Sequence, residues 1–428
     1  MKKIFTSVIK HPLFSGSAIM VFGSNSINLL NYIYHLVIGR MLGPTFYGEL
    51  AALISVIGLL GIIPGAVSLV IVKQISSAKN EQEVSNLIKW FKTKMLIGSL
   101  IFSCFVLIFS PFISSFLHIT KVTYFILIAL SFVFALQAGF NRSILQGLLK
   151  FKEMILSVFV ENAAKLLISV ALVYLGFRVG GAMVAFVLAA VLGFLVTNHY
   201  LEIKSKKESN SSLNLKPMLL FTIPVMVQSL AVTSLYSSDL ILVKHFFSSH
   251  DAGLYASLST LGKIIFFAAG PIGSVMFPIV SKRHAKGLKV KRIFLYSCFA
   301  TAVVSLSILI VYLLFPKLAV NLLYGSAYLE SANLLIWFGI FMTLFTFSSL
   351  LINFHLSLNR VKVVILPLLA SIAQIAVIWF YHKSLFDVIL VSIIVTALLL
   401  VLLLIYSTYG DKLNINNSSR FQTRKDDS

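Results

Sequence analysis

Long apolar segments alternate with short polar connectors along nearly the whole chain. Most segments offer about 20 or more residues, the length that an α-helix needs to cross a hydrocarbon core. Lipid cannot satisfy exposed backbone groups, and the short alternation typical of barrel strands is absent, so we expect helices. The pattern predicts twelve membrane-spanning helices, at residues 14–37, 47–72, 95–117, 122–148, 154–176, 180–203, 218–245, 251–281, 293–316, 331–356, 362–381 and 385–408.

The composition supports this interpretation and excludes an ordinary soluble protein. Of the 428 residues, 58% are hydrophobic and 11% are charged, which is too little charge to cover a soluble surface of that size. No loop exceeds about 22 residues, so no separate soluble domain is expected. The N-terminal stretch "MKKIFTSVIKHPLF" begins like a signal peptide, but the following apolar stretch is long and has no typical cleavage site, which favours an uncleaved first helix. The fold class is therefore an all-α polytopic membrane protein.

The lysines and arginines are distributed very unevenly between the two sides. With the N-terminus inside, 26 of the 35 fall in cytoplasmic segments and six in outer loops, and three lie inside helices. This bias predicts that both termini are cytoplasmic and that the chain is a multi-pass protein of the cell (cytoplasmic or inner) membrane. The formal net charge of +21 is then due to lysines and arginines that orient the chain in the membrane, so we expect no nucleic-acid partner.

Two halves of the chain resemble each other. The segment beginning "GPTFYGELAAL" can be laid over "SSHDAGLYASL" so that Gly48 matches Gly253. We therefore predict a six-helix lobe over residues 1–208, a second six-helix lobe over 209–408 around a central cavity, and a polar cytoplasmic tail over 409–428. Each copy carries an interior proline beside a glycine, which makes these positions candidate hinges; they are Pro64, Gly65, Gly270 and Pro271.

At these positions the sequence resembles a known transporter family. The stretches "GRMLGPTFYGELAAL" and "SSDLILVKHFFSSHDAGLYASLSTLGKIIFFAAGPIGSVMFPIVSK" are similar to those of the oligosaccharide flippases. That family consists of polysaccharide-biosynthesis transporters within the multidrug/oligosaccharidyl-lipid/polysaccharide exporter superfamily. The resemblance implies a flippase that moves a lipid-diphosphate-linked oligosaccharide from the cytoplasmic to the outer leaflet by alternating access, for cell-surface polysaccharide synthesis. Implied partners are that substrate, membrane lipids and possible further polysaccharide-assembly proteins.

Five ionisable side chains fall inside the predicted helices, where charge is expensive and usually functional. From the helical rise, the shallowest lies about 8 Å below the outer face and Lys165 lies near the midplane. Three cations against two acids leave the interior net positive, which suits an anionic diphosphate. The substrate-path candidates are therefore Arg142, Lys165, Lys263, Glu161 and Asp239.

Structural roles for these charges remain open alternatives. Glu161 and Lys165 are four residues apart in the favourable order for an intrahelical ion pair. Asp239 can pair with Lys263 across helices, or it can titrate in a coupled proton cycle.

A polar stripe on the first predicted helix adds further path candidates. Asn28, Asn31 and His35 recur at helical spacing on one face, where amides suit sugar recognition or join membrane helices. Weaker candidates of the same kind are Gln137, Asn141, Gln146, Gln228 and Asn353.

Other function classes fit less well. We expect no enzyme, because the outer loops are short and no H-E-x-x-H motif or paired-carboxylate cluster occurs. We expect no direct drive by ATP, because no phosphate-binding loop occurs. The two cysteines offer no metal or disulfide framework, so we expect no metal and no cofactor, with proton or sodium coupling left open. The alternative function is a cation-coupled multidrug or toxin extrusion transporter, whose cationic substrates favour buried carboxylates over buried lysines.

Overall fold

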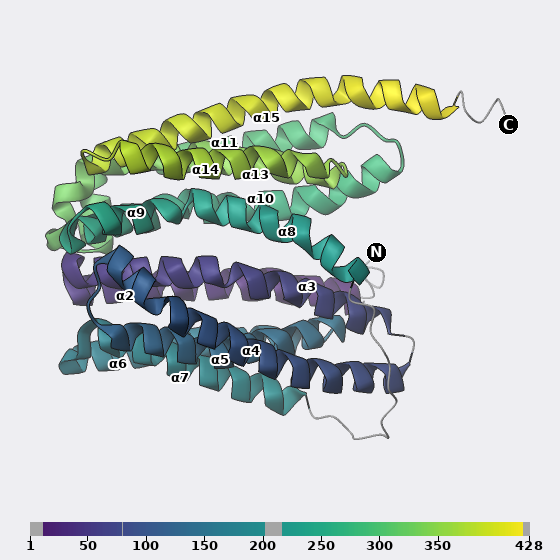
Figure 1. Ribbon diagram of the computed structural model, residues 1–428. Helices are drawn as coiled ribbons and strands as arrows, with labels where there is room; N and C mark the ends of the chain where they lie inside the picture. Colours follow the sequence, from purple (N-terminus) through teal and green to yellow (C-terminus); the bar gives the residue numbers. More distant parts are fainter. Residues whose placement is uncertain (1–11, 79, 202–215, 423–428) are drawn as a thin grey trace, which may run out of the picture. The chain divides into compact units, whose positions relative to one another are not determined.

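The computed structural model describes residues 12–78, 80–201 and 216–422, and the part it describes is helical without a β-strand (Figure 1). The predicted all-α class is therefore confirmed. The elements of the first half are α2 (Pro12–Leu60), α3 (Ile62–Ser77), α4 (Glu81–Leu117), α5 (Val122–Gly147), α6 (Phe151–Leu172), η1 (Val173–Phe177) and α7 (Arg178–Tyr200). Those of the second half are α8 (Lys216–Leu235), α9 (Ser238–Phe246), α10 (Ser249–Ala285), α11 (Lys291–Leu314), α12 (Pro316–Leu323), η2 (Ser326–Leu334), α13 (Leu335–Ser357), η3 (Val361–Val364), α14 (Ile365–Phe380) and α15 (Leu385–Gln422).

The number of membrane crossings depends on two glycines that reverse the chain. Over the described residues, nine helical stretches are long and apolar enough to cross a membrane, and the bent pair α8–α9 makes a tenth. Two of these stretches have 56 and 50 residues, far longer than one crossing needs. They turn at Gly43 (φ 69°) and Gly176 (φ 89°), conformations that glycine adopts without steric cost. Each therefore contains two crossings, which gives the twelve predicted from the sequence.

The chain divides into two compact units. The first comprises residues 1–226 and 247–253, and the second comprises residues 227–246 and 254–428. In the first unit α5, α6 and α7 pack together, α2 lies against α6, and α3 and α4 lie against α5 (Figure 1). In the second unit α13 packs against α11 and α15, and α14 packs against α15. The predicted lobe boundary after residue 208 lies outside the described residues and stays a prediction.

The glycines that match between the two halves lie in one close helix crossing within the first unit. A Cβ placed on Gly48 would lie 2.6 Å from the backbone nitrogen of Gly253. A Cβ placed on Gly253 would lie 2.8 Å from Cα of Pro44. Real Cβ atoms do not approach backbone this closely, so both glycines are needed for the two segments to touch. The sequence repeat thus marks a structural contact.

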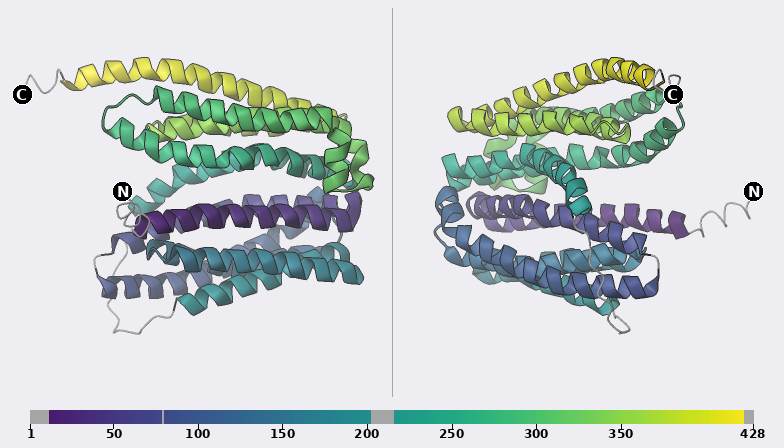
Figure 2. Two further views of the ribbon diagram at one scale, coloured as in Figure 1. Left: turned by 180° about the vertical axis from the view of Figure 1, so that it is seen from behind. Right: turned by 45° about the vertical axis from the view of Figure 1, so that its right-hand side comes forward.

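The second unit contains two departures from regular helices. Between residues 235 and 238 the chain bends by 48°, so that α8 and α9 form one broken span. Beyond α11, the short helix α12 turns crosswise at that helix's end (Figure 2). By contrast α10 runs without interruption from Ser249 to Ala285 although Pro271 and Pro278 lie inside it.

The proline motifs therefore have different effects in the two halves. In the first half the helix is interrupted at Gly61, between α2 and α3, three residues before Pro64. Proline lacks the N–H that would bond to the carbonyl one turn earlier, which accounts for a break near this position. In the second half α10 is continuous through Gly270 and Pro271. A hinge role for Pro64, Gly65, Gly270 and Pro271 stays a prediction.

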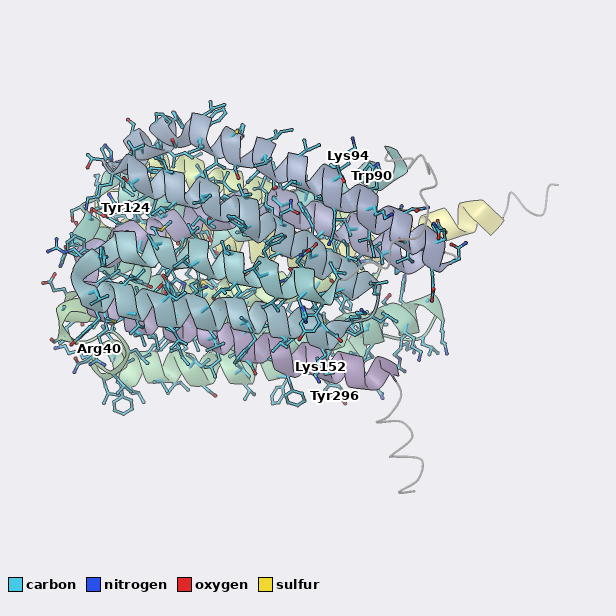
Figure 3. The ribbon with its side chains drawn as sticks, turned by 90° about the horizontal axis from the view of Figure 1, so that it is seen from below. Arg40, Trp90, Lys94, Tyr124, Lys152 and Tyr296 are labelled. Atoms are coloured by element: carbon cyan, nitrogen blue, oxygen red, sulfur yellow. The ribbon has the colours of Figure 1, made fainter. Side chains whose placement is uncertain are left out.

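Side chains of two predicted cytoplasmic connectors lie at the same end of the first unit. Figure 3 places Arg40 and Tyr124 at one end of the helices, and Trp90, Lys94 and Lys152 at the other. We call the second end, which carries the lysine-rich connectors, the basic end.

Candidate functional site

Lys165 of α6 lies half-buried among neutral groups in the first unit. Its ammonium donates to Oδ1 of Asn31 on α2 at 2.7 Å and to Oδ1 of Asn162 at 3.0 Å. It also lies 5.0 Å from the ring centre of Tyr34 and 5.3 Å from that of Phe186 on α7, within the range of a cation–π interaction. We call these five residues the Lys165 cluster.

The orientation of the two amides follows from their own helices. Asn31 donates through Nδ2 to the carbonyl of Ile27, and Asn162 donates to the carbonyl of Val158, each one turn earlier. These bonds direct both amide oxygens toward the ammonium. Lys165 is therefore held by two partial negative charges and two ring faces, and no carboxylate of the described residues lies within ion-pair distance of it. Lys165 would therefore not have to give up an ion pair in order to bind an anion.

Glu161 pairs with Arg142 of α5, which decides one of the alternatives left open by the sequence. The carboxylate of Glu161 forms a short ion pair with the guanidinium, and Arg142 also donates to Oγ of Ser157 at 2.9 Å. The intrahelical pair of Glu161 with Lys165 is not formed as an ion pair. Glu161 influences Lys165 only electrostatically over a longer distance. Arg142 and Glu161 therefore neutralise each other, and Lys165 is left as the excess cation of these three.

Gly193 of α7 makes room for this ion pair. A Cβ at that position would lie 2.8 Å from the Arg142 guanidinium and closer still to the Glu161 carboxylate. Both charged side chains are largely buried, with exposed fractions of 16% and 23%. The pair connects α5 with α6 at the point where Gly193 of α7 packs against it.

The other predicted residues of the first helix lie near the Lys165 cluster but differ in their surroundings. His35 follows Tyr34, and its Nδ1 lies 3.1 Å from the hydroxyl of Tyr47. Asn28 is exposed. Of the polar stripe, Asn31 is thus the member that directly contacts the buried charge.

In the second unit Asp239 and Lys263 occupy one electrostatic cluster. Asp239 is fully buried at the start of α9, where it accepts hydrogen bonds from the hydroxyl of Tyr255 at 2.7 Å and the backbone N–H of Leu240 at 2.8 Å. Lys263 of α10 is half-buried and interacts electrostatically with Asp239. Its ammonium lies 5.2 Å from the ring centre of Tyr236. Asp239 and Lys263 therefore attract each other across helices, but, like Glu161 and Lys165, they do not form an ion pair.

The bend between α8 and α9 explains this arrangement. Tyr236 lies in the non-helical turn between them, and Asp239 lies in the first turn of α9, where helix N-termini favour negative charge. The hydroxyls of Ser234 and Ser238 are 2.7 Å apart across the bend. A straight helix would not bring both Tyr236 and Asp239 into the surroundings of Lys263.

A cavity of about 490 Å³ lies within the second unit, between α8, α10, α11 and α13. Two of the weaker sequence candidates, Gln228 and Asn353, line it, as does the hinge candidate Gly270. Two other candidates have structural roles, because Gln137 donates to Ser99 at 3.0 Å and Asn141 donates to Thr197 at 3.2 Å. The presence of an amide side chain in the sequence thus does not tell whether the residue lines a cavity or joins two helices.

Several site residues were not among the sequence candidates. The rings of Tyr34, Phe186 and Tyr236, the hydroxyl of Tyr255 and the small residue Gly193 complete the clusters. Tyr34 had a usable signal, because it follows Asn31 by three residues and so lies on nearly the same helix face. The others are aromatic or small residues in apolar segments, and their role depends on packing.

Comparison with known proteins places the chain in a family. Residues 14–284 match the model of a family described as polysaccharide biosynthesis protein. An uncharacterised membrane protein of Methanocaldococcus jannaschii is 24% identical over 276 residues, which covers 59% of this chain and 63% of that relative. The match thus spans less than two thirds of the relative's length.

Two solved structures show the same fold. A multidrug resistance MATE family transporter of the MOP superfamily, in an inward-facing conformation, superposes with a TM-score of 0.70 at 17% identity, covering 90% of this chain and 96% of the transporter. The lipid II flippase MurJ, in an inward closed conformation, superposes with a TM-score of 0.72 at 14% identity, covering 91% of this chain and 87% of the flippase. The chain belongs to the polysaccharide biosynthesis protein family and has the twelve-helix, two-lobe fold of these membrane transporters.

Proposed function

We propose that this protein is a flippase that moves a lipid-diphosphate-linked oligosaccharide from the cytoplasmic to the outer leaflet by alternating access, for synthesis of a cell-surface polysaccharide. The observation that carries the proposal is the set of neutral partners around Lys165. A lysine that only joins helices gains most from a carboxylate, because an unpaired charge away from water is costly. Here the available carboxylate of Glu161 is bonded to Arg142 instead.

The chemistry of the Lys165 cluster suits a phosphate or diphosphate. An ammonium donates to anionic oxygens, and such charge-assisted bonds are stronger than bonds to amide oxygens. A diphosphate would therefore replace one of the two asparagine contacts at Lys165 with a net gain. Asn31 and Asn162 keep the ammonium in place between transport events.

The second unit argues against a cationic substrate. Its buried carboxylate, Asp239, is bonded to Tyr255 and balanced by Lys263, so it is not available to a cationic drug. The extrusion alternative therefore lacks a specific observation in its favour, and it serves below as an outcome of the test.

The remaining parts of the proposal follow from charge and family. The basic end would face the cytoplasm of the cell membrane, with both termini on that side, because lysine-rich loops stay inside. A substrate with two negative charges would be driven outward by an inside-negative potential, which supplies about 2.3 kcal/mol per charge per 100 mV. The proposal includes contacts with other polysaccharide-assembly proteins, and it is compatible with proton or sodium coupling.

The experiment measures movement of a fluorescent lipid-diphosphate oligosaccharide in reconstituted vesicles, with a membrane-impermeant quencher outside. Lys165→Ala is compared with Lys165→Arg, which keeps the charge, and with Lys121→Ala as the matched control. Lys121 also lies over a tyrosine, at 5.7 Å from the ring centre of Tyr124, but at an exposed position before α5.

We expect the wild type and Lys121→Ala to expose the inner-leaflet probe to the quencher. Lys165→Ala should slow this exposure by about tenfold or more, the effect of losing one charge-assisted contact, and Lys165→Arg should restore part of it. If the wild type leaves the inner leaflet protected but exports a cationic dye, the flippase proposal is wrong and extrusion replaces it.

A further inference from the structure

The connector between α10 and α11 carries a dense group of exposed cations. Within eleven residues, from 282 to 292, it contains six lysines and arginines and one histidine, and all of these side chains are exposed. The chain has no Asp or Glu between Asp251 and Glu330, so no acid lies near this segment in the sequence. We call residues 282–292 the basic hairpin; its cations are Lys282, Arg283, Lys286, Lys289, Lys291 and Arg292.

No acidic side chain of the described residues forms an ion pair with the cations of the basic hairpin. The ion pairs found in that part of the chain involve Glu161 and Asp251 instead. The connector between α13 and α14, at the same end of the second unit, adds Arg360 and Lys362 and also has no acid. Like charges held so close together repel one another, so a negatively charged partner would stabilise this surface.

Hydrogen bonds give the backbone of the basic hairpin a defined conformation. At the end of α10 the N–H of Gly287 donates to the carbonyl of His284 at 2.9 Å, and the N–H of Leu288 donates to that of Arg283 at 3.0 Å. Gly287 has φ 68°, the left-handed conformation that commonly ends a helix. Because α11 begins four residues later, at Lys291, the turn is short and presents its cations together.

One side of the basic hairpin is packed against the interior of the second unit. Val290, Ile293 and Phe294 pack against a buried hydrophobic cluster, which consists of Met276, Val280, Leu350, Phe354 and Leu358. The rings of Phe294 and Phe354 are stacked with their centres 4.2 Å apart. The apolar side chains thus fix the hairpin from within, and the cations are exposed on its other side. A preformed surface of this kind loses little conformational freedom when it binds a partner.

The equivalent connector of the first half has a different charge pattern. It follows α3 and places Glu81 and Glu83 in the first turn of α4. Acids suit that position, because helix N-termini favour negative charge. In the second half the first turn of α11 has no acid and contains Lys291 and Arg292. The unbalanced positive charge is therefore particular to the second half.

The orientation of the chain in the membrane does not require these six cations. Without them, the predicted cytoplasmic segments would still hold 20 lysines and arginines, against six in the outer loops. That remaining bias is large enough to orient a multi-pass protein. The density of cations in the basic hairpin therefore points to a further role.

The basic hairpin is close to the expected membrane surface and has apolar side chains that suit it. By helical rise, Lys286 lies about 8 Å beyond Ser281, where the predicted crossing ends, which is about one Debye length at physiological ionic strength. Leu288 is 49% exposed, and Tyr296 on α11 is 72% exposed with its ring pointing outward (Figure 3). Cations beside exposed apolar and aromatic side chains are typical of segments that bind anionic lipid surfaces.

From this charge, packing and position we propose that the basic hairpin binds the head groups of anionic phospholipids in the adjoining leaflet. Lysine and arginine both bind phosphate, and an anionic head group supplies the negative charge that the described residues do not. A zwitterionic head group carries its own cation and leaves the surface unbalanced. A soluble acidic segment would use the cations but would leave Leu288 and Tyr296 exposed, which favours the lipid. The surface is separate from the Lys165 cluster, so the inference does not rest on the proposed function.

The test measures the lipid selectivity of the full chain in vesicles by electron paramagnetic resonance of spin-labelled phosphatidylglycerol and phosphatidylcholine. The ratio of the two association constants with the protein is the selectivity. The hairpin variant replaces four cations with glutamine: Lys286→Gln, Lys289→Gln, Lys291→Gln and Arg292→Gln. The matched control replaces four lysines around the first-half connector: Lys73→Gln, Lys89→Gln, Lys92→Gln and Lys94→Gln.

We expect the wild type to prefer phosphatidylglycerol, and the hairpin variant to lower the selectivity by about fivefold or more. Each lysine or arginine near an anionic surface contributes about fivefold in binding. The control should change the selectivity by less than about twofold, because Glu81 and Glu83 already balance part of that connector. A third variant keeps the charge and should keep the selectivity: Lys286→Arg, Lys289→Arg and Lys291→Arg. High salt should lower the selectivity of the wild type.

A second measurement needs no variant. Phosphatidylglycerol with a photoactivatable head group, incorporated around the wild type, should attach within residues 282–299, as located by mass spectrometry of the cleaved chain. The inference is overturned if the wild type does not distinguish the two lipids, if the control loses the selectivity equally, or if the lipid attaches elsewhere. It is also overturned if a soluble glutamate-rich peptide displaces phosphatidylglycerol from the wild type, since the partner would then be an acidic protein segment.

Discussion

The ion pair between Arg142 and Glu161 predicts a strong energetic coupling between two helices. We consider the substitutions Arg142→Met and Glu161→Met, each of which leaves the other charge without its partner. Fully exposed ion pairs contribute about 0–1 kcal/mol, whereas removing one partner of a buried pair costs about 3–5 kcal/mol. The two side chains are 16% and 23% exposed, which places the pair between these limits and nearer the buried one.

The bonds of Arg142 to Ser157 reduce the cost, because the guanidinium keeps a donor contact when the carboxylate is lost. We therefore expect each single substitution to lower the free energy of unfolding by about 2 kcal/mol. The double variant replaces both charges with apolar side chains and should lose about 1 kcal/mol rather than the additive sum of about 4 kcal/mol. The coupling free energy is then about 3 kcal/mol.

The measurement is reversible unfolding in mixed micelles of increasing denaturing-detergent content, for the wild type, both single variants and the double variant. Additive losses would refute the interpretation of the pair as a coupled structural unit. The rate at which the double variant transfers the lipid-diphosphate probe between leaflets distinguishes a structural role of the ion pair from a role in the substrate path. If the pair is structural, transfer should stay near the wild-type rate. Loss of transfer in a stable double variant would indicate that Arg142 contacts the substrate.

Three further outcomes follow from the same clusters. Gly193→Ala should lower the free energy of unfolding by about 1–3 kcal/mol in the same unfolding assay, because its Cβ would collide with the ion pair. The control Gly98→Ala, whose Cβ would meet no atom within 4 Å, should change that free energy by less than about 0.5 kcal/mol. Asp239→Asn should lower the thermal midpoint of unfolding more than Tyr255→Phe does. Asp239→Asn leaves Lys263 without its balancing charge, whereas Tyr255→Phe removes one hydrogen bond worth about 1–3 kcal/mol. Equal shifts of the thermal midpoint would contradict this reasoning. An inside-negative potassium diffusion potential in vesicles should bias the lipid-diphosphate probe toward the outer leaflet, with a driving free energy of about 4.6 kcal/mol per 100 mV for two charges, and should not bias an uncharged lipid.

The helix pattern was predictable because each crossing must satisfy its backbone internally, which forces long apolar segments and short connectors. Twelve crossings and the all-α class follow from that constraint alone. The exact helix ends did not follow, since Gly43 and Gly176 turn the chain within what remains nearly continuous helix. The continuity of α10 through Pro271 was also not predictable, because neighbouring groups can compensate for the hydrogen bond that proline removes.

Charge could be located from the sequence, but pairing could not. The spacing of Glu161 and Lys165 favoured a local pair, yet the carboxylate bonds to Arg142, nineteen residues away on another helix. A local rule compares neighbours on one helix and has no information about the helices that pack against it. Asn31 was correctly singled out as polar, but its contact with Lys165, 134 residues later, depends on the packing of α2 against α6.

The two halves share a scaffold but do not share their buried lysines. At the register that matches Gly48 with Gly253, Lys263 corresponds to Gly58, and Lys165 corresponds to Ala370. The repeat therefore accounts for the glycine crossing, whereas each lysine belongs to its own half. In both units the ammonium nevertheless lies over a tyrosine, Tyr34 or Tyr236, from the first membrane span of its half. Because the duplicated helices alone do not require these charges, the repeat does not explain why each unit has a buried lysine, and we propose that the ligand does.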